Sequence, residues 1–485
     1  MFAASNVFLD FNLPNATTWF YFSLLLAVAL FFKFGRLLSV RNLDVPTLFF
    51  GVPGLLMVQH ARNNVAPPTQ AQAAVAADSV SQMFAPALGG AALPFEPVVL
   101  ALHPAVTQSA ALNWTFLGYL SILLGSGYFF FRCLMDLTLV QRPALSPNLT
   151  LGGSIWLAAA LFVCLATVAF RQPEPGRLPD PALTGANAPV AVQKVGPESA
   201  PLALARESLT DYTWLLRSVA VFCHLLVVVG LALIGRFHFQ DTASGMAAAT
   251  FYLILPYTGL FVGQAHHVWP MALIVWAVLF YRYPTVAGTL LGVAGATSYF
   301  PALIVPLWAS FYWRRGAGRF LLAALVSAAI CLSVTGVILW YQGELENSLE
   351  QAFRHGAWQP WQAPPPGTEG FWTGLHWVYR IPLFIAFVAF VLVTPFWPMP
   401  KNLAQVLALS AAVIVGIQFW YANQGGVYVL WYLPLLLLLV FRPNLEDRRP
   451  PLLDAETDWA ARLVRSIGGF VRWIVHRPQP EKAVK

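Results

Sequence analysis

Charged side chains are scarce in this sequence. Only 10% of its 485 residues are Asp, Glu, Lys or Arg, whereas 58% are hydrophobic and the mean hydropathy is +0.64. Soluble domains carry roughly 25% charged residues. The composition therefore excludes a soluble enzyme, a secreted disulfide scaffold and a receptor with a single membrane anchor. It predicts an all-α polytopic membrane protein.

Cysteine is also rare, and no obvious metal or nucleic-acid motif accompanies it. The four cysteines lie in or beside apolar segments without paired spacing, so we expect no disulfide framework and no metal site. The basic residues occur singly at the ends of apolar runs instead of forming a stripe, so nucleic acid is not an expected partner. No cofactor is evident, and nothing in the sequence supports a divalent metal. No removable signal peptide is expected, because no basic segment precedes a cleavage site.

Long apolar runs are abundant, and a transmembrane helix needs about 20 such residues. We predict about thirteen helices from runs bounded by charge, Pro or Gly. Their ranges are 17–34, 46–59, 112–131, 150–170, 213–234, 243–262, 267–281, 285–298, 300–313, 320–341, 380–396, 403–421 and 427–441.

Basic residues mark every second predicted turn. Cytoplasmic turns carry an excess of Lys and Arg, so we expect the N-terminus outside, the C-terminus in the cytosol, and a multi-pass protein of the bacterial cytoplasmic (inner) membrane. The expected inner-turn residues are Lys33, Arg36, Arg41, Arg132, Arg142, Arg236, Arg282, Arg314, Arg315, Arg319, Lys401 and Arg442.

The chain divides into a membrane domain, residues 1–441, and a cytosolic tail, residues 442–485. Outer loops 60–111 and 171–211 are rich in Ala, Pro, Gln and Gly, and we expect them to be flexible. Outer loop 342–379 is rich in Trp and is expected to form a folded cap or an interfacial helix on the outer face. In the tail, about 458–476 has the spacing of an amphipathic helix that binds anionic lipid. Packing of this helix on the inner loops is the alternative.

Two early inner turns share Arg and Asp residues. Asp44 follows Arg41 in the first of them, while Arg132 and Asp136 flank the second. Opposite charges in such turns can pair and hold helices together. A cytosolic functional site is the alternative reading.

Strongly polar residues gather at two irregular segments on the expected outer side. The first segment contains Gln264, His266 and His267, which can hydrogen-bond a phosphate or a sugar hydroxyl. In the second, Tyr299 and Pro301 interrupt an apolar run and leave backbone groups to be satisfied by protein or a watery cavity. We expect the two segments to wall one cavity, although a hydrated interfacial turn would also explain the first.

The stretch 263–315 resembles the integral-membrane glycosyltransferases of family 87, within the GT-C superfamily. Members have a Gly-Gln pair at a helix end, an apolar hairpin, a Gly-rich helix, a Lys-x-x-Pro break and a helix ending in basic residues. The matching positions are Gly263, Gln264, Gly288, Gly292, Pro301, Arg314 and Arg315. A looser similarity to a late helix of these enzymes involves Tyr421, Asn423, Tyr428, Trp431, Tyr432 and Pro434.

The resemblance implies transfer of a sugar from a polyprenyl-phosphate donor to an acceptor at the outer face of the membrane. It implies a carboxylate base, for which the candidates are Asp10, Asp78, Glu96 and Glu344. Candidate substrate-binding residues are Gln264, His266, His267, Tyr299, Arg354, His355, Arg380, Tyr421, Asn423 and Gln424. This sequence departs from the family pattern because Ser298 stands where the family has Lys, and no early Asp motif is present.

Two other functions are consistent with the residues. Broken helices suit a transporter or flippase for a lipid or a small polar solute, although the apolar runs carry few carboxylates for ion coupling. Replacement of the family Lys by Ser298 suits a catalytically inactive membrane scaffold that binds partners through its loops and tail.

Overall fold

The structure, a computed structural model, describes residues 16–36, 38–64, 96–138, 145, 147–171, 213–341, 343, 345, 359–364, 368–373, 375–443, 445 and 448–452. Within these ranges the regular elements are helices, and no strand occurs. The all-α prediction is confirmed for this part of the chain. The amphipathic helix expected at about 458–476 lies outside the described residues, as do residues 65–95 and 172–211 of the expected flexible loops. Residues 96–111, which were also expected to be part of a flexible loop, are helical and form the first part of α5.

The helices follow the predicted apolar runs, with several divisions. In chain order the longer elements are α1 (Ala16–Phe31), α2 (Val40–Thr47), α3 (Val52–Asn64), α5 (Glu96–Asp136), α6 (Leu151–Arg171), α9 (Thr213–Ile234), α10 (Thr242–Ile254), α11 (Pro256–Leu260), α12 (Ala265–Leu279), α13 (Pro284–Thr297), α14 (Tyr299–Ala302), α15 (Val305–Phe311), α16 (Ala317–Tyr341), α18 (Arg380–Val393), α19 (Leu403–Trp420) and α20 (Leu433–Phe441). Short turns of other helix types are η1 (Phe34–Arg36), η4 (Gly235–Phe239, a π-helix), η5 (Trp377–Tyr379) and η6 (Val429–Trp431).

Five of the described helices are long and apolar enough to cross a membrane. They are Trp114–Asp136, Leu151–Arg171, Trp214–Phe239, Ala317–Tyr341 and Leu403–Trp420. Shorter apolar helices accompany them, among them α10 and α12. These lengths and compositions are compatible with a membrane-embedded helical protein.

Proline divides two runs that were predicted as single helices. The run 243–262 breaks at Leu255, which is extended at φ −62° and ψ 134° because a proline disfavours the helical conformation of the residue before it. The run 300–313 splits into α14 and α15, and Pro306 occupies the first turn of α15. The predicted run 46–59 is likewise shared between α2 and α3. Each division leaves irregular backbone between short helices.

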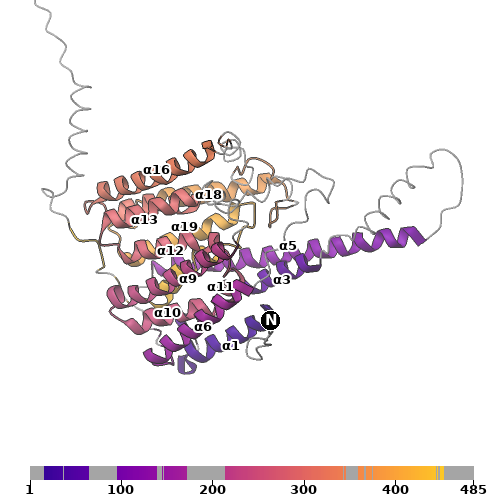
Figure 1. The fold of residues 1–485 in the computed structure, drawn as a ribbon, viewed down its shortest axis with the longest axis horizontal. Helices are drawn as coiled ribbons and strands as arrows, with labels where there is room; N and C mark the ends of the chain where they lie inside the picture. Colours follow the sequence, from indigo (N-terminus) through magenta and orange to yellow (C-terminus); the bar gives the residue numbers. More distant parts are fainter. Residues whose placement is uncertain are drawn as a thin grey trace, which may run out of the picture.

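The helices lie side by side and run back and forth between two ends of the bundle (Figure 1). Helix α19 is buried along most of its length, whereas α16 lies at the periphery with many exposed apolar side chains. Helix α5 projects beyond the other helices at its Glu96 end (Figure 1).

The two ends of the bundle differ in chemistry. Each of the turns 235–241, 280–283, 312–316, 394–402 and 442–452 carries at least one described Lys or Arg, and we call this the basic end. Turns 261–264, 298–304 and 421–428 meet at the other end, which we call the aromatic end.

Small residues bring α13 and α16 into backbone contact. A Cβ atom on Gly288 would lie 2.3 Å from the carbonyl oxygen of Phe320, and one on Gly292 would lie 2.3 Å from that of Ala324. Only glycine permits this approach, as the four-residue spacing of the small side chains predicts.

Buried ion pairs join the two early turns that share Arg and Asp. Arg132 of α5 pairs with Asp44 of α2 and with Asp136 one helical turn away. Asp136 also pairs with Arg442, just after α20. The structure therefore confirms that these charges pair, and it adds the chain after α20 to the junction.

Candidate functional site

Aromatic side chains from three separate stretches of the chain form one contiguous cluster at the aromatic end. The ring of Phe300 lies 4.9 Å from that of Trp431 and 5.4 Å from that of Tyr421, measured between centroids. Tyr428 lies 5.2 Å from Trp431 and 6.4 Å from Tyr421. We call the six rings the aromatic cluster: Phe261, His267, Phe300, Tyr421, Tyr428 and Trp431.

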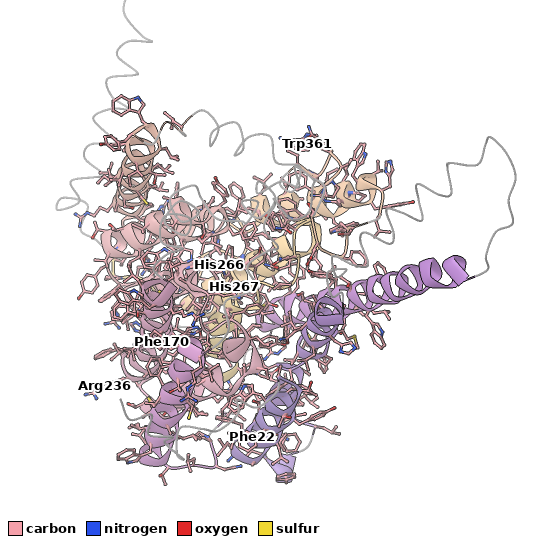
Figure 2. All side chains as sticks on the ribbon, turned by 45° about the vertical axis from the view of Figure 1, so that its right-hand side comes forward. Phe22, Phe170, Arg236, His266, His267 and Trp361 are labelled. Carbon is pink, nitrogen blue, oxygen red and sulfur yellow. The ribbon has the colours of Figure 1, made fainter. Side chains whose placement is uncertain are left out.

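His267 is stacked between two members of this cluster. Its imidazole lies 4.2 Å from the ring of Phe261 and 5.2 Å from that of Tyr428, nearly parallel to both. The side chain is buried at the first turn of α12. His266 is half-buried beside it, with ring centroids 4.5 Å apart (Figure 2).

The two irregular segments expected to meet are linked through Trp431. Its indole N–H donates to the carbonyl oxygen of His266 over 3.1 Å, while its ring packs on Phe300. A second link joins the indole N–H of Trp269 to the hydroxyl of Thr297 over 3.0 Å. Segments 263–267 and 298–301 are thus brought to the same level of the bundle.

Polar residues of the second segment differ in exposure. Ser298, at the position of the family Lys, is fully buried, and its hydroxyl has no hydrogen-bond partner among the described residues. Tyr299 next to it is 36% exposed. The break therefore presents a phenol to the surface of the described chain, and the serine faces the protein interior.

Part of the Trp-rich loop is bound to the turn after α19. The backbone N–H of Gln424 donates to the carbonyl oxygen of Glu369 over 2.6 Å, and the indole N–H of Trp372 donates to that of Phe419 over 3.0 Å. Gly370 is pressed so closely on this turn that an added Cβ would lie 2.3 Å from the carbonyl oxygen of Ala422. The loop therefore has a defined position beside the aromatic cluster.

Arg380 holds the same region together from the start of α18. It is fully buried, and its Nε donates to the carbonyl oxygen of Trp420 over 3.1 Å. Its Nη1 donates to the carbonyl oxygen of Gln362 over 3.4 Å. Arg380 thus connects the Trp-rich loop to the cluster.

Amide side chains line the turns of the aromatic end. Gln264, Asn423 and Gln424 are half-buried, and Gln424 adopts a left-handed backbone conformation at φ 52°. Such a conformation is uncommon for a residue with a side chain. The left-handed Gln424 ends the 422–424 turn, and its backbone N–H is the one that binds the carbonyl oxygen of Glu369.

Glu369 is a carboxylate that sequence reasoning overlooked. It is exposed and lies against the 422–424 turn. The other carboxylates whose side chains are described, Asp44, Asp136 and Asp241, belong to the basic end. The signal available in the sequence was its place in the Trp-rich loop, directly after the Pro365-Pro366-Gly367 turn.

Most of the remaining predicted site residues are not among those that the structure describes. Asp10, Asp78, Glu344, Arg354 and His355 lie outside the described residues. Glu96 is the first residue of α5.

Among the described residues, no group of three or more His, Cys, Asp or Glu side chains is placed to hold a metal ion. Comparisons with protein-family models, with curated proteins and with solved structures find no match for this chain.

Proposed function

We propose that this protein transfers a sugar from a polyprenyl-phosphate donor to an acceptor at the aromatic end of the bundle. The basic end then faces the cytosol, since positive charge is retained on that side, and the aromatic end faces outward from the bacterial cytoplasmic membrane. In this proposal the apolar runs supply about thirteen membrane-embedded segments, several of them short or divided.

The observation that supports this proposal best is the position of Glu369. Its side chain is exposed, and its backbone carbonyl accepts from the backbone N–H of Gln424, in the turn between Tyr421 and Tyr428 of the aromatic cluster. Aromatic faces pack against the C–H bonds of sugar rings, and a carboxylate accepts the proton of an attacking hydroxyl. An aromatic surface can thus bind the sugar, and a carboxylate can activate the acceptor hydroxyl.

The proposed reaction is a single displacement. An acceptor hydroxyl loses its proton to the carboxylate of Glu369 while its oxygen bonds to the anomeric carbon of the donor sugar. The bond between that carbon and the phosphate oxygen breaks, and polyprenyl phosphate leaves with the bonding electron pair. The proton then passes from Glu369 to water, which restores the carboxylate.

The other polar groups have binding and positioning roles in the proposal. Gln264 and His266 are half-buried at the start of α12 and are proposed to donate hydrogen bonds to the donor phosphate. Tyr299, Asn423 and Gln424 are proposed to contact the sugar. Arg380 is buried and bound to backbone carbonyls, so it positions the Trp420–Tyr421 segment.

The test compares membranes containing the wild-type chain, Glu369→Gln and Asp241→Asn. Asp241 caps α10 at the basic end, where its side chain accepts from the backbone N–H of Ala243, and Asn retains this capping ability. Each sample is incubated with polyprenyl-phosphate sugars labelled in the sugar, and labelled product is separated from donor.

We expect the transfer rate of Glu369→Gln to be at least about 100-fold lower than that of wild type, a loss typical of a missing general base. Asp241→Asn should retain the wild-type rate. Full activity in Glu369→Gln contradicts the role of this carboxylate. Absence of labelled product from every donor with the wild-type chain contradicts transfer itself and favours the inactive scaffold.

A further inference from the structure

A group of arginines at the basic end is held together by contacts that the proposed transfer reaction does not use. Tyr312 donates its hydroxyl proton to the carbonyl oxygen of Tyr281 over 2.6 Å. This bond joins the α12–α13 turn to the α15–α16 turn, and so brings Arg282 and Arg314 into one region. Both side chains are exposed.

The chain after α20 adds two more arginines to this region. Arg315 donates to the carbonyl oxygen of Pro450. The backbone N–H of Leu403 donates to the carbonyl oxygen of Arg448 over 2.8 Å, which ties this segment to the start of α19. Because Pro450 directly follows Arg448 and Arg449, the contact of Arg315 with Pro450 brings these two arginines beside the α15–α16 turn that carries Arg314. We call Arg282, Arg314, Arg448 and Arg449 the basic patch.

The basic patch carries positive charge that the described chain does not neutralise. None of its four guanidinium groups forms a salt bridge with a described carboxylate, whereas Arg132 and Arg442 at the same end are paired. The Nε of Arg282 donates only a long hydrogen bond, to the phenol oxygen of Tyr281 over 3.5 Å. Within the described part of the chain, the charge of the patch is therefore not balanced by a carboxylate.

Two exposed aromatic residues place the patch at the level of lipid headgroups. Tyr283 follows Arg282 and Trp313 precedes Arg314, and each aromatic side chain is 61% exposed. Trp and Tyr are enriched where a membrane protein meets the bilayer–water interface. Basic pockets between transmembrane helices on the cytosolic side bind acidic lipid headgroups.

The backbone of Arg314 is also unusual. Its φ of 59° lies in the left-handed region, which is unfavourable for a residue with a side chain. Gly316 two residues later also has a positive φ, at 105°. The turn thus holds an arginine where glycine would be relaxed, and that arginine is exposed beside Trp313.

From these contacts we propose that the basic patch binds the phosphate of an anionic glycerophospholipid in the membrane leaflet at the basic end. The lipid phosphate lies between Arg282 and Arg448, Arg314 and Arg449 supply further charge, and Tyr283 and Trp313 flank the glycerol region. This site is separate from the expected lipid-binding helix in the tail and does not depend on the proposed transfer reaction.

The experiment uses the purified full-length protein in a neutral detergent. Dioleoylphosphatidylglycerol is titrated into wild type, Arg282→Gln, Arg448→Gln and Arg236→Gln, and lipid binding is followed by native mass spectrometry and by the midpoint of thermal unfolding. Arg236 is the matched control, because it is exposed in the 235–241 turn of the same end and lies over the ring of Phe237. Dioleoylphosphatidylcholine and inorganic phosphate are titrated separately.

We expect phosphatidylglycerol to bind wild type and Arg236→Gln equally. Each patch substitution is expected to weaken binding about 5-fold, and the two together about 30-fold, since one basic residue near a lipid surface contributes about 1 kcal/mol. Arg282→Lys keeps the charge and should retain most of the affinity. Phosphatidylcholine and inorganic phosphate should not stabilise the protein.

Three results would overturn the proposal. Unchanged binding in Arg282→Gln and Arg448→Gln places the lipid elsewhere, for example on the tail. An equal loss in Arg236→Gln shows a general effect of net charge. Stabilisation by inorganic phosphate that disappears in the patch variants identifies a site for the free anion instead of a lipid.

Discussion

Arg132 and Asp44 face each other in a two-point salt bridge inside the protein. The Nε–Oδ1 and Nη2–Oδ2 distances are both 2.7 Å, and both side chains are buried. Paired geometry of this kind is the strongest form of the arginine–carboxylate interaction. It joins α2 to α5, and the bond of Arg132 to Asp136 extends the junction to Arg442 after α20.

Removal of one partner of this bridge should destabilise the protein more than removal of an exposed charge. We expect Asp44→Asn to lower the free energy of unfolding by roughly 3–5 kcal/mol, because it leaves the guanidinium of Arg132 buried without its main partner. Thermal unfolding of the purified protein in detergent measures the change, with Arg236→Gln as the exposed control. A loss as small as that of the control would show that the bridge is hydrated and weak.

The close packing of α13 on α16 leads to a second prediction, about the free energy of unfolding. Gly292→Ala should lower the free energy of unfolding by about 1–3 kcal/mol, because the new methyl group meets the backbone of Ala324, which cannot move aside. Gly336→Ala in α16 is the matched control, since an added Cβ there meets nothing within 4 Å. It should be neutral or stabilise the helix by up to about 1 kcal/mol. Equal behaviour of the two variants in thermal unfolding would contradict the observed helix spacing.

The position of Gly370 links packing to the proposed activity. A Cβ at this residue would lie 2.3 Å from the carbonyl oxygen of Ala422, so Gly370→Ala should displace the loop that carries Glu369. We expect transfer activity to fall at least about 10-fold, since small displacements of a catalytic group are costly, while the unfolding midpoint changes little. Gly152→Ala, which meets nothing within 4 Å, is the control. Unchanged transfer activity in Gly370→Ala would show that the reaction does not depend on the position of this loop.

Lys401 should give the protein a measurable pH dependence of stability. Burial lowers the pKa of its ammonium group from 10.5 to about 8, and its Nζ donates to the carbonyl oxygen of Pro395. The unfolded chain binds the proton more tightly than the folded protein between these two values, so stability attributable to Lys401 rises as the pH rises from about 8 to 10.5. Below pH 8 its contribution is constant and unfavourable.

The measurement is the difference in unfolding midpoint between wild type and Lys401→Met at each pH. This difference should narrow as the pH rises through the window, because methionine has no proton to lose and keeps the apolar stem. A difference that is independent of pH would show that the Lys401 side chain is hydrated in the folded protein.

Much of the helical layout was predictable from the apolar runs, because backbone groups in a membrane must be satisfied within the segment. Local chemistry also indicated several breaks, as at Pro301, whereas the break at Leu255 was missed inside a continuous apolar run. The spacing of Gly288 and Gly292 predicted close packing but could not name α16 as the partner. That choice depends on which helices lie side by side.

Some candidate site residues were indicated by the sequence, and another was shown only by the tertiary structure. The sequence singled out His266, His267 and Tyr421 by type and position, and the structure brings them into one region through Trp431 and Tyr428. It did not indicate that Glu369 lies against the 422–424 turn, because that contact joins segments far apart in the chain.

The sequence by itself determined the helical membrane character, the gathering of positive charge on alternate turns and the positions where proline and glycine interrupt the helices. These properties depend on composition and local geometry. Only the tertiary structure decided that Asp44 pairs with Arg132, that His267 lies between Phe261 and Tyr428, and that Tyr312 joins its turn to Tyr281. Such pairings depend on how the helices pack against one another, which no local pattern encodes.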